Sequence, residues 1–461
     1  MRRLLAIITL SCVAATMAAV TGGNAGAGGN NERQGVTKKL IKVGGLASPP
    51  NDTLNVAYPD GYEGVEAYFD KINKEEGGVF GRKLKLVAKL SDQGQPSANI
   101  RAVRSLVEEK KVFAVLPIMT NSFTLGGRYL AEKGIPSFGI NVDPAWCGSS
   151  DEQDAVESAY LDNDPPQFTQ CPRPNLFGEK GSFLCFECPG VGPAFLASQL
   201  GFSRAAVFGY THISSTRCVN GTVSGLEELG VEVVHSNQSL EFGFSVSDVA
   251  ADVQAMIDAD VQIVLTCMEF NGGFKLSQGL KEAGKDDVVF YAPEGYKEST
   301  VEKYGEELNG FYFRLGFAPW QAKKSELPKG TKQFLAAMKK RGIEPSEHSQ
   351  AGWINAALLV EGIKKAGKNF TWSSVVEAIN SITDFTADGI LPPIDWTSNG
   401  HGPGIEACDA WVEAVDGKFE VRFAKPGQPF VCFDVSPFPS NLDTPYYQPL
   451  KEGETGAVLG P

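Results

Sequence analysis

The sequence predicts an α/β protein made of two Rossmann-like lobes with parallel-rich sheets. Two stretches, residues 40–140 and 205–292, alternate apolar strand patterns with amphipathic helix patterns, which is typical of βαβ units. The 461 residues are 42% hydrophobic and include 51 glycines, enough for packed cores and many strand-to-helix turns. Residues 143–190 interrupt the alternation with prolines and four cysteines, and we interpret them as an insertion.

The N-terminus has the pattern of a secretory signal peptide, residues 1–27. Arg2 and Arg3 precede the apolar run Leu4–Val20, and Ala25-Gly26-Ala27 provides a small-residue cleavage site. The alternative is a membrane-spanning helix, but this run of 17 residues is short for a span. We therefore expect an exported protein, located in the periplasm or the outer cell envelope.

An alternative function of the N-terminal segment is to anchor the protein to a membrane through a lipid on Cys12. Ser11 fits the small residue that precedes a lipidated cysteine, but Thr9 departs from the leucine of that motif. Lipidation is therefore an alternative that we do not favour.

The charge and cysteine counts narrow the class of protein. Asp and Glu outnumber Lys and Arg by 55 to 42, a net charge of −13, which lacks the basic surface of a nucleic-acid-binding protein. Eight cysteines besides Cys12 predict disulfides in an exported chain. Cys185 and Cys188 have the spacing of a metal or redox pair, but no second pair or nearby histidines accompany them, so we favour structural disulfides. Cys408 and Cys432 flank a hairpin pattern and are expected to pair.

The elements of the first stretch follow from residue spacing. Val65, Phe69 and Ile72, for example, recur at helical intervals, whereas strands are apolar or alternating runs. The expected strands are Leu40–Leu46, Lys83–Lys89, Val112–Pro117 and Pro136–Ile140, and the expected helices are Gly61–Glu75, Ser97–Glu109 and Ser122–Lys133.

The second stretch is interpreted in the same way. Its expected strands are Ala205–Tyr210, Val231–His235, Val261–Cys267, Val288–Ala292 and Gly310–Phe317, and its expected helices are Cys218–Leu229, Ser247–Ala259 and Phe274–Ala283. Three helices follow, Lys329–Arg341, Glu347–Ala366 and Ser373–Ile382, and then a hairpin of Ala410–Val415 and Lys418–Phe423.

This order suggests how the chain divides. A flexible tether is expected at residues 28–37. The N-terminal lobe is expected to contain 38–145 and 318–385, and the C-terminal lobe 146–317 and 386–435, followed by a Pro/Gly-rich tail at 436–461. The acidic run Asp151–Asp164 lacks calcium-loop spacing, so we interpret it as a solvated loop rather than a calcium site.

Motifs of catalysis are absent from the sequence. It contains no phosphate-binding glycine motif, no G-x-S-x-G and no H-E-x-x-H, and its four histidines form no pattern. We therefore expect no enzyme, no cofactor and no metal site.

Several segments resemble the solute-binding proteins of ABC importers in the branched-chain amino-acid (leucine/isoleucine/valine) binding family. The segments lie in the order and at the spacing of that family, between about residues 40 and 425. They are Ile41–Leu46, Gly61–Gly64, Ile72-Asn73, Gly77–Leu84, Asp92-Gln93-Gly94, Ala102–Val107, Val115–Thr120, Gly134-Ile135-Pro136 and Tyr291–Gly295.

The resemblance implies a type I periplasmic-binding-protein fold, with two lobes joined by three crossover segments and a ligand between them. It also implies a monomer that binds a small polar solute, an amino acid or amide-like compound, and delivers it to ABC permease subunits in the membrane. A sensory receptor that reports to a signalling partner is the alternative, and an envelope enzyme is a less favoured one.

The resemblance also names candidate ligand-binding residues. Thr120, Asn121 and Ser122 follow a strand and open a helix, where hydroxyl and free N–H groups suit an anion, although they also suit a helix cap. Family members grip the amino-acid head group with the residues that match Thr120 and the loop from Asn141 to Asp143. Asp143 differs from the small or hydroxyl residue usual there.

The remaining candidates come from the second lobe and from the segment before the first helix. Glu294 matches a glutamate that receives the ligand ammonium, so Glu294 and Thr120 are expected to contact the ligand from opposite lobes. Phe270 and Tyr58 match aromatic residues near the ligand, with core packing as the alternative for both. Tyr210 ends a strand. In the family a D-x-x-Y-G motif usually follows this strand, and Thr211–Ser215 replace it here.

Overall fold

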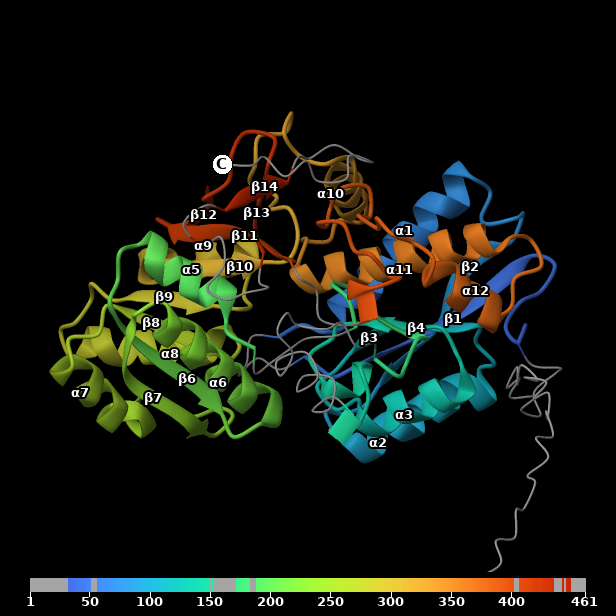
Figure 1. The fold of residues 1–461 in the computed structure, drawn as a ribbon. Coiled ribbons are helices and arrows are strands. Elements are labelled where there is room, and N and C mark those ends of the chain that lie inside the picture. Colours follow the sequence, from blue (N-terminus) through green and yellow to red (C-terminus); the bar gives the residue numbers. More distant parts are fainter. Residues whose placement is uncertain are drawn as a thin grey trace, which may run out of the picture.

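The computed structural model describes residues 32–50, 56–149, 151–152, 171–182, 188–401, 406–434, 442 and 445–448. The predicted signal peptide and most of the acidic run and of the tail lie outside these residues. The described part forms two lobes, each built around one β-sheet (Figure 1).

The first sheet has five parallel strands in the order β2-β1-β3-β4-β5. Helices α1 and α10–α12 lie on one face of it, and α2 and α3 lie on the other (Figure 1). The strands are β1 Leu40–Ala47, β2 Lys83–Ser91, β3 Ala114–Met119, β4 Ser137–Gly139 and β5 Leu176–Gly178. The helices are α1 Asp60–Glu75, α2 Pro96–Arg104 with a π-helical turn Ser105–Glu109, α3 Thr124–Lys133, α10 Lys329–Arg341, α11 Glu347–Ala366 and α12 Trp372–Ile379.

The second sheet has nine strands, and its parallel part repeats the same strand order as β7-β6-β8-β9-β10. Antiparallel strands β11, β13 and β14 extend it, and β12 pairs with β11. The strands are β6 Arg204–Tyr210, β7 Glu232–Leu240, β8 Ile263–Cys267, β9 Val289–Ala292, β10 Phe311–Leu315, β11 Glu406–Val415, β12 Lys418–Arg422, β13 Phe430–Asp434 and β14 Tyr446–Gln448. The helices are α5 Val191–Gln199, α6 Ile213–Glu228, α7 Ala250–Asp258, α8 Phe270–Glu282 and α9 Glu298–Tyr304.

The chain changes lobe three times. It passes from the first sheet to the second after β5, returns after β10 to form α10–α12, and enters the second sheet again at β11. The predicted fold class, two α/β lobes with parallel-rich sheets and three crossovers, is confirmed.

Four segments lie elsewhere than the predicted boundaries put them. Strand β5, assigned to the second lobe, pairs with β4 in the first sheet. Trp396, also assigned to the second lobe, packs its ring against Phe177 of β5. Within the predicted tether, Gln34 donates to the carbonyl of Val107 at 2.9 Å, so residues 32–37 are part of the first lobe. Within the predicted tail, β14 pairs with β13.

Helices α1 and α11 pack closely because glycines face each other at their crossing. A Cβ on Gly64 would fall 1.7 Å from the carbonyl oxygen of Ser349, and a Cβ on Gly352 would fall 2.0 Å from that of Gly61. No side chain larger than hydrogen fits either position. This contact holds α11, which lies far along the chain, against the first helix.

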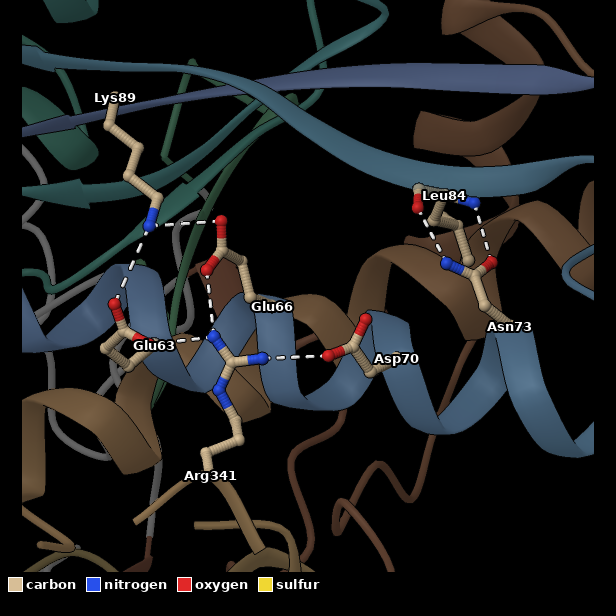
Figure 2. A network of polar contacts seen from close by, with 7 residues as sticks. All are labelled: Glu63, Glu66, Asp70, Asn73, Leu84, Lys89 and Arg341. Atoms are coloured by element: carbon tan, nitrogen blue, oxygen red, sulfur yellow. Dashed lines mark hydrogen bonds and ion pairs between the residues drawn. The ribbon is translucent and has the colours of Figure 1, made fainter. Parts of the chain in front are cut away.

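A polar network also joins α10 to α1 (Figure 2). The Arg341 guanidinium donates to Glu63, Glu66 and Asp70 at 2.8–3.0 Å, and Lys89 of β2 pairs with Glu63 and Glu66. At the other end of α1, the Asn73 amide makes two hydrogen bonds to the backbone of Leu84 (Figure 2). The Ile72-Asn73 motif therefore fixes the end of α1 to β2.

The described cysteines are oxidised, as expected. The predicted pair Cys408–Cys432 is confirmed, and its residues face each other on β11 and β13. Two further disulfides join Cys147 to Cys171 and Cys218 to Cys267, and Cys188 is also disulfide-bonded. No helix within the described ranges is long and apolar enough to cross a bilayer.

Candidate functional site

Polar residues gather where the strands of both sheets end. In each sheet the strand order reverses direction beside its first strand, between β1 and β3 and between β6 and β8. Ligands of open α/β sheets bind beyond the carboxyl ends of strands at such reversal points. Thr120 follows β3, Tyr210 ends β6 and Glu269 follows β8, so three of these ends carry polar groups.

Thr120 is fully buried, and its hydroxyl is engaged within the protein. The hydroxyl donates to Asp92 and accepts from Ser48 at 3.1 Å and from the backbone N–H of Ser122 at 3.0 Å. Asp92 also accepts from Asn99 at 3.1 Å. The Asp92-Gln93-Gly94 motif thus fixes the end of β3, and ligand contact by Thr120 stays a prediction.

Asp143 also serves the local backbone. Its carboxylate accepts from the backbone N–H of Phe123 at 3.1 Å and from that of Ala145 at 2.8 Å. Burial raises the pKa of Asp143 in spite of these hydrogen bonds and of the nearby His212 and Arg173. A carboxylate of the protein itself therefore already accepts from a backbone N–H at the start of α3.

Tyr58 and Asn121 come together at the first lobe's edge. The Tyr58 hydroxyl donates to the Asn121 side-chain oxygen at 3.1 Å, and its ring meets the edge of His348 with centroids 5.0 Å apart. Burial and the charge of Glu294 raise the pKa of Tyr58 well above its usual value. Burial lowers the pKa of His348 to about 4, so this imidazole is neutral near pH 7.

Glu294 lies among other carboxylates. Burial raises its pKa to about 8, and the charges of Glu347, Glu269 and Glu179 add to this effect, while Lys180 opposes it. Glu294 and Glu269 follow strands of the second sheet, whereas Glu179 follows β5 of the first sheet and Glu347 begins α11. Both lobes therefore supply carboxylates to one region.

Backbone contacts hold this region together across the two lobes. The Glu347 carboxylate accepts from the backbone N–H of Gly295 at 2.9 Å, directly after Glu294. On the other side, the Ser214 hydroxyl at the start of α6 donates to the carbonyl of Val142 at 3.0 Å. Asn141, next to Val142, is buried and its backbone N–H donates to Glu179.

Tyr210 and Phe270 have different surroundings. The Tyr210 hydroxyl donates to Glu269 at 2.8 Å, which places Tyr210 beside the carboxylates. Phe270 is buried at the start of α8 and stacks on Phe274 and Phe313, with ring centroids 5.6 and 6.4 Å apart. Core packing, the alternative weighed for Phe270, describes its position.

The sequence did not identify four residues of this region as candidates: Glu179, Glu269, Glu347 and His348. Glu269 could have been found, because it follows a strand and caps α8 by accepting from the N–H of Gly272 at 3.1 Å. Glu179 lies in the Cys/Pro-rich insertion, where no periodicity marks a strand end. Within the described residues, no group of three or more His, Cys, Asp or Glu side chains has an arrangement that could hold a metal ion.

A comparison with protein families matches residues 56–417 to the periplasmic binding protein family. This match covers well over half of the chain. The chain belongs to this family. Family membership implies an exported, ligand-binding protein. None of the curated proteins matches the chain in sequence.

Solved structures show the same fold at low sequence identity. A substrate-binding protein of an ABC transporter from Aeropyrum pernix has a TM-score of 0.65 and 17% identity, covering 83% of this chain and 95% of that one. A leucine-binding protein from Thermotoga maritima has a TM-score of 0.63 and 17% identity, covering 83% and 98%. A solute-binding protein from R. palustris, solved in complex with benzoate, has a TM-score of 0.61 and 16% identity, covering 83% and 95%.

Proposed function

We propose that this protein is the solute receptor of an ABC importer. It binds a small polar solute between its lobes and presents the ligand-bound form to permease subunits in the membrane. Amino acids and amide-like compounds are the classes that the sequence suggests. The observation that carries the proposal is that polar residues from strand ends of both sheets and from the starts of α1 and α11 come together. They are Tyr58, Asn121, Glu179, Glu269, Glu294 and Glu347.

The relatives support this proposal. Structural neighbours are named as ABC transporter binding proteins, and two of them were solved with benzoate or isoleucine. In this function the protein holds the ligand by hydrogen bonds and charge interactions. The ligand is released chemically unchanged, because no covalent bond is made or broken. Each lobe supplies part of the binding surface, so ligand binding favours the closed arrangement of the lobes.

The test is identification of the natural ligand. Purified mature protein is denatured, and the small molecules that it releases are identified by mass spectrometry. Each candidate is then added back in a thermal-shift assay, in which saturating ligand should raise the melting temperature. Recovery of an unaltered solute that stabilises the protein supports the proposal, whereas steady conversion of that solute into a product contradicts it.

A further inference from the structure

The carboxyl groups of Glu294 and its three acidic neighbours bear on the chemistry of the ligand. Three of the charges that act most strongly on Glu294 are negative, from Glu347, Glu269 and Glu179, and one is positive, from Lys180. Carboxylates that share a partly buried region repel each other and lower stability. Such an arrangement is costly unless protons or another cation neutralise part of the charge.

Glu179 gives a second, independent indication. This side chain is 7% exposed, and within the described part of the chain its Oε2 atom has no hydrogen-bond partner. Buried carboxylate oxygens are nearly always hydrogen-bonded in folded proteins. The Glu179 charge acts on both Glu294 and Glu347, and the backbone N–H of Asn141 is the neighbouring donor to this carboxylate. A donor from a ligand would satisfy it.

The groups that could hold a ligand carboxylate are already engaged. At the start of α3, the N–H of Ser122 donates to Thr120 and the N–H of Phe123 donates to Asp143. The hydroxyl of Thr120 donates to Asp92. The negative charge of Asp143 at this place would also repel a second carboxylate.

Aromatic rings border the carboxylates on the second lobe. The Phe242 side chain is 50% exposed and lies against the Tyr210 ring, with centroids 4.3 Å apart. The Tyr210 hydroxyl bonds to Glu269. Aromatic faces next to carboxylates attract organic cations.

We propose that the ligand is a small organic dication, with two amine or guanidinium groups and no carboxylate. One cationic group contacts Glu294 and Glu269 of the second lobe, and the other contacts Glu179 and Glu347 of the first. The inference rests on the proposed solute-binding function and specifies its ligand. A dication offsets negative charge from both lobes at once, which a zwitterionic amino acid does not.

Proton release accompanies this binding. The ionisable groups that face Glu294 are Glu347, Glu269, Glu179, Lys180 and Tyr58. Because the pKa of Glu294 is raised to about 8, this carboxyl is largely protonated in the free protein at neutral pH. A cation favours the ionised form, so its affinity should rise as the pH rises toward about 8.

The test is calorimetric titration of the full mature protein with 1,4-diaminobutane, with leucine and with the uncharged analogue 1,4-butanediol. We expect the diamine to bind at least about tenfold more tightly than leucine, and the diol not to bind detectably. The heat of diamine binding should depend on the ionisation enthalpy of the buffer, because protons are released.

Three Glu→Gln variants, which replace a carboxyl with an amide of the same shape, assign the effect to the cluster. Glu294→Gln and Glu179→Gln should each weaken diamine binding by about tenfold or more, as expected for loss of a charged hydrogen bond. Glu228→Gln, at an exposed position on α6, should bind as the wild type does. Far-ultraviolet circular dichroism identifies a variant that fails to fold, and Glu294→Gln alone then decides the outcome.

The other outcomes separate this inference from the proposed function. If leucine binds more tightly than the diamine, the proposal that the ligand is a dication is wrong, but the proposed solute-binding function still stands. Absence of diamine binding also overturns the dication, and the ligand-release experiment then decides the function separately. Equal diamine affinity in Glu294→Gln and in the wild type contradicts the placement of the cation.

Discussion

At the scale of single residues, Glu294 illustrates a conflict between binding and stability. Its carboxyl is partly buried beside three others, and its pKa is raised to about 8. Ligand-binding sites commonly lower the stability of the free protein, because their polar groups lack interaction partners until the ligand binds.

Glu294→Gln should therefore stabilise the free protein slightly. The folded state retains a proton that the unfolded chain loses between the ordinary glutamate pKa near 4.5 and about 8, so wild-type stability should fall as the pH rises through this window. The variant should lack this component and melt about 1–2 °C higher at pH 8. Calorimetric melting of both proteins across this pH range checks the prediction, and a lower melting temperature in the variant contradicts it.

Thr120→Val should lower stability by about 1–3 kcal/mol, because it removes the hydroxyl that donates to buried Asp92. Thr120→Ser retains the hydroxyl and is the matched control. Urea unfolding of the three proteins measures the difference, and equal stability of Val and Ser variants would show that the hydrogen bond contributes nothing.

At the scale of helices and strands, packing against distant elements decides stability. Helices α10 and α11 join the first lobe only after the chain has returned from the second, and glycine contacts and the Arg341 network attach them to α1.

Gly64→Ala should be strongly destabilising, by about 3 kcal/mol or more, because the new Cβ would meet the backbone of α11. Gly273→Ala in α8 is the control, since its Cβ would meet Thr266 at 3.4 Å, an ordinary contact. Alanine there also favours the helix by about 0.5–1 kcal/mol. Chemical denaturation should show opposite effects of the two substitutions, and similar effects would rule out close helix packing as the cause.

Arg341→Gln should cost about 1 kcal/mol, since it removes the cation from three carboxylates on one face of α1 (Figure 2). The loss should shrink as salt is added, because ions screen the remaining repulsion. Arg128→Gln disrupts only the exposed pair with Glu132 and should change stability by less than about 0.5 kcal/mol. A salt-independent loss in Arg341→Gln would indicate lost packing instead.

Elements with clear end signals were predictable from the sequence. Helices α10 and α11 match their predicted bounds, because Gly342 ends the first in a left-handed conformation and Ser346 caps the second. Strand β5 was missed because a strand of three residues is too short to show a period. Glu179 and Glu347 were missed for a related reason: only the chain crossings bring these isolated carboxylates near Glu294.

At the scale of the whole molecule, the two lobes are joined by three connections and by contacts near Glu294. Lys297 of the second lobe lies 3.8 Å from both Asp60 and Glu344 of the first, and Glu347 bonds to the backbone after Glu294. Contacts of this kind fix the relative position of the lobes in the absence of ligand. Binding of a ligand between the lobes can then shift them to a different position.

Saturating ligand should therefore compact the protein and stabilise it. A hundredfold excess over Kd raises the free energy of unfolding by about 2.7 kcal/mol when only the folded state binds. Small-angle X-ray scattering should show a smaller radius of gyration with ligand than without. An unchanged radius together with full thermal stabilisation would mean that the solute binds without lobe closure.

The late return of the chain to the first lobe has a consequence for biogenesis. All strands of the first sheet have been synthesised by Gly178, but α10–α12, which complete the cover of one face beside α1, end only at Ile379. Most of the second lobe lies between these points. A chain that crosses a membrane from its N-terminus thus leaves one face of this sheet covered by α1 alone for roughly 200 residues, at about 5–20 residues per second of synthesis. Efficient export should therefore depend on a chaperone that shields this sheet until α11 arrives.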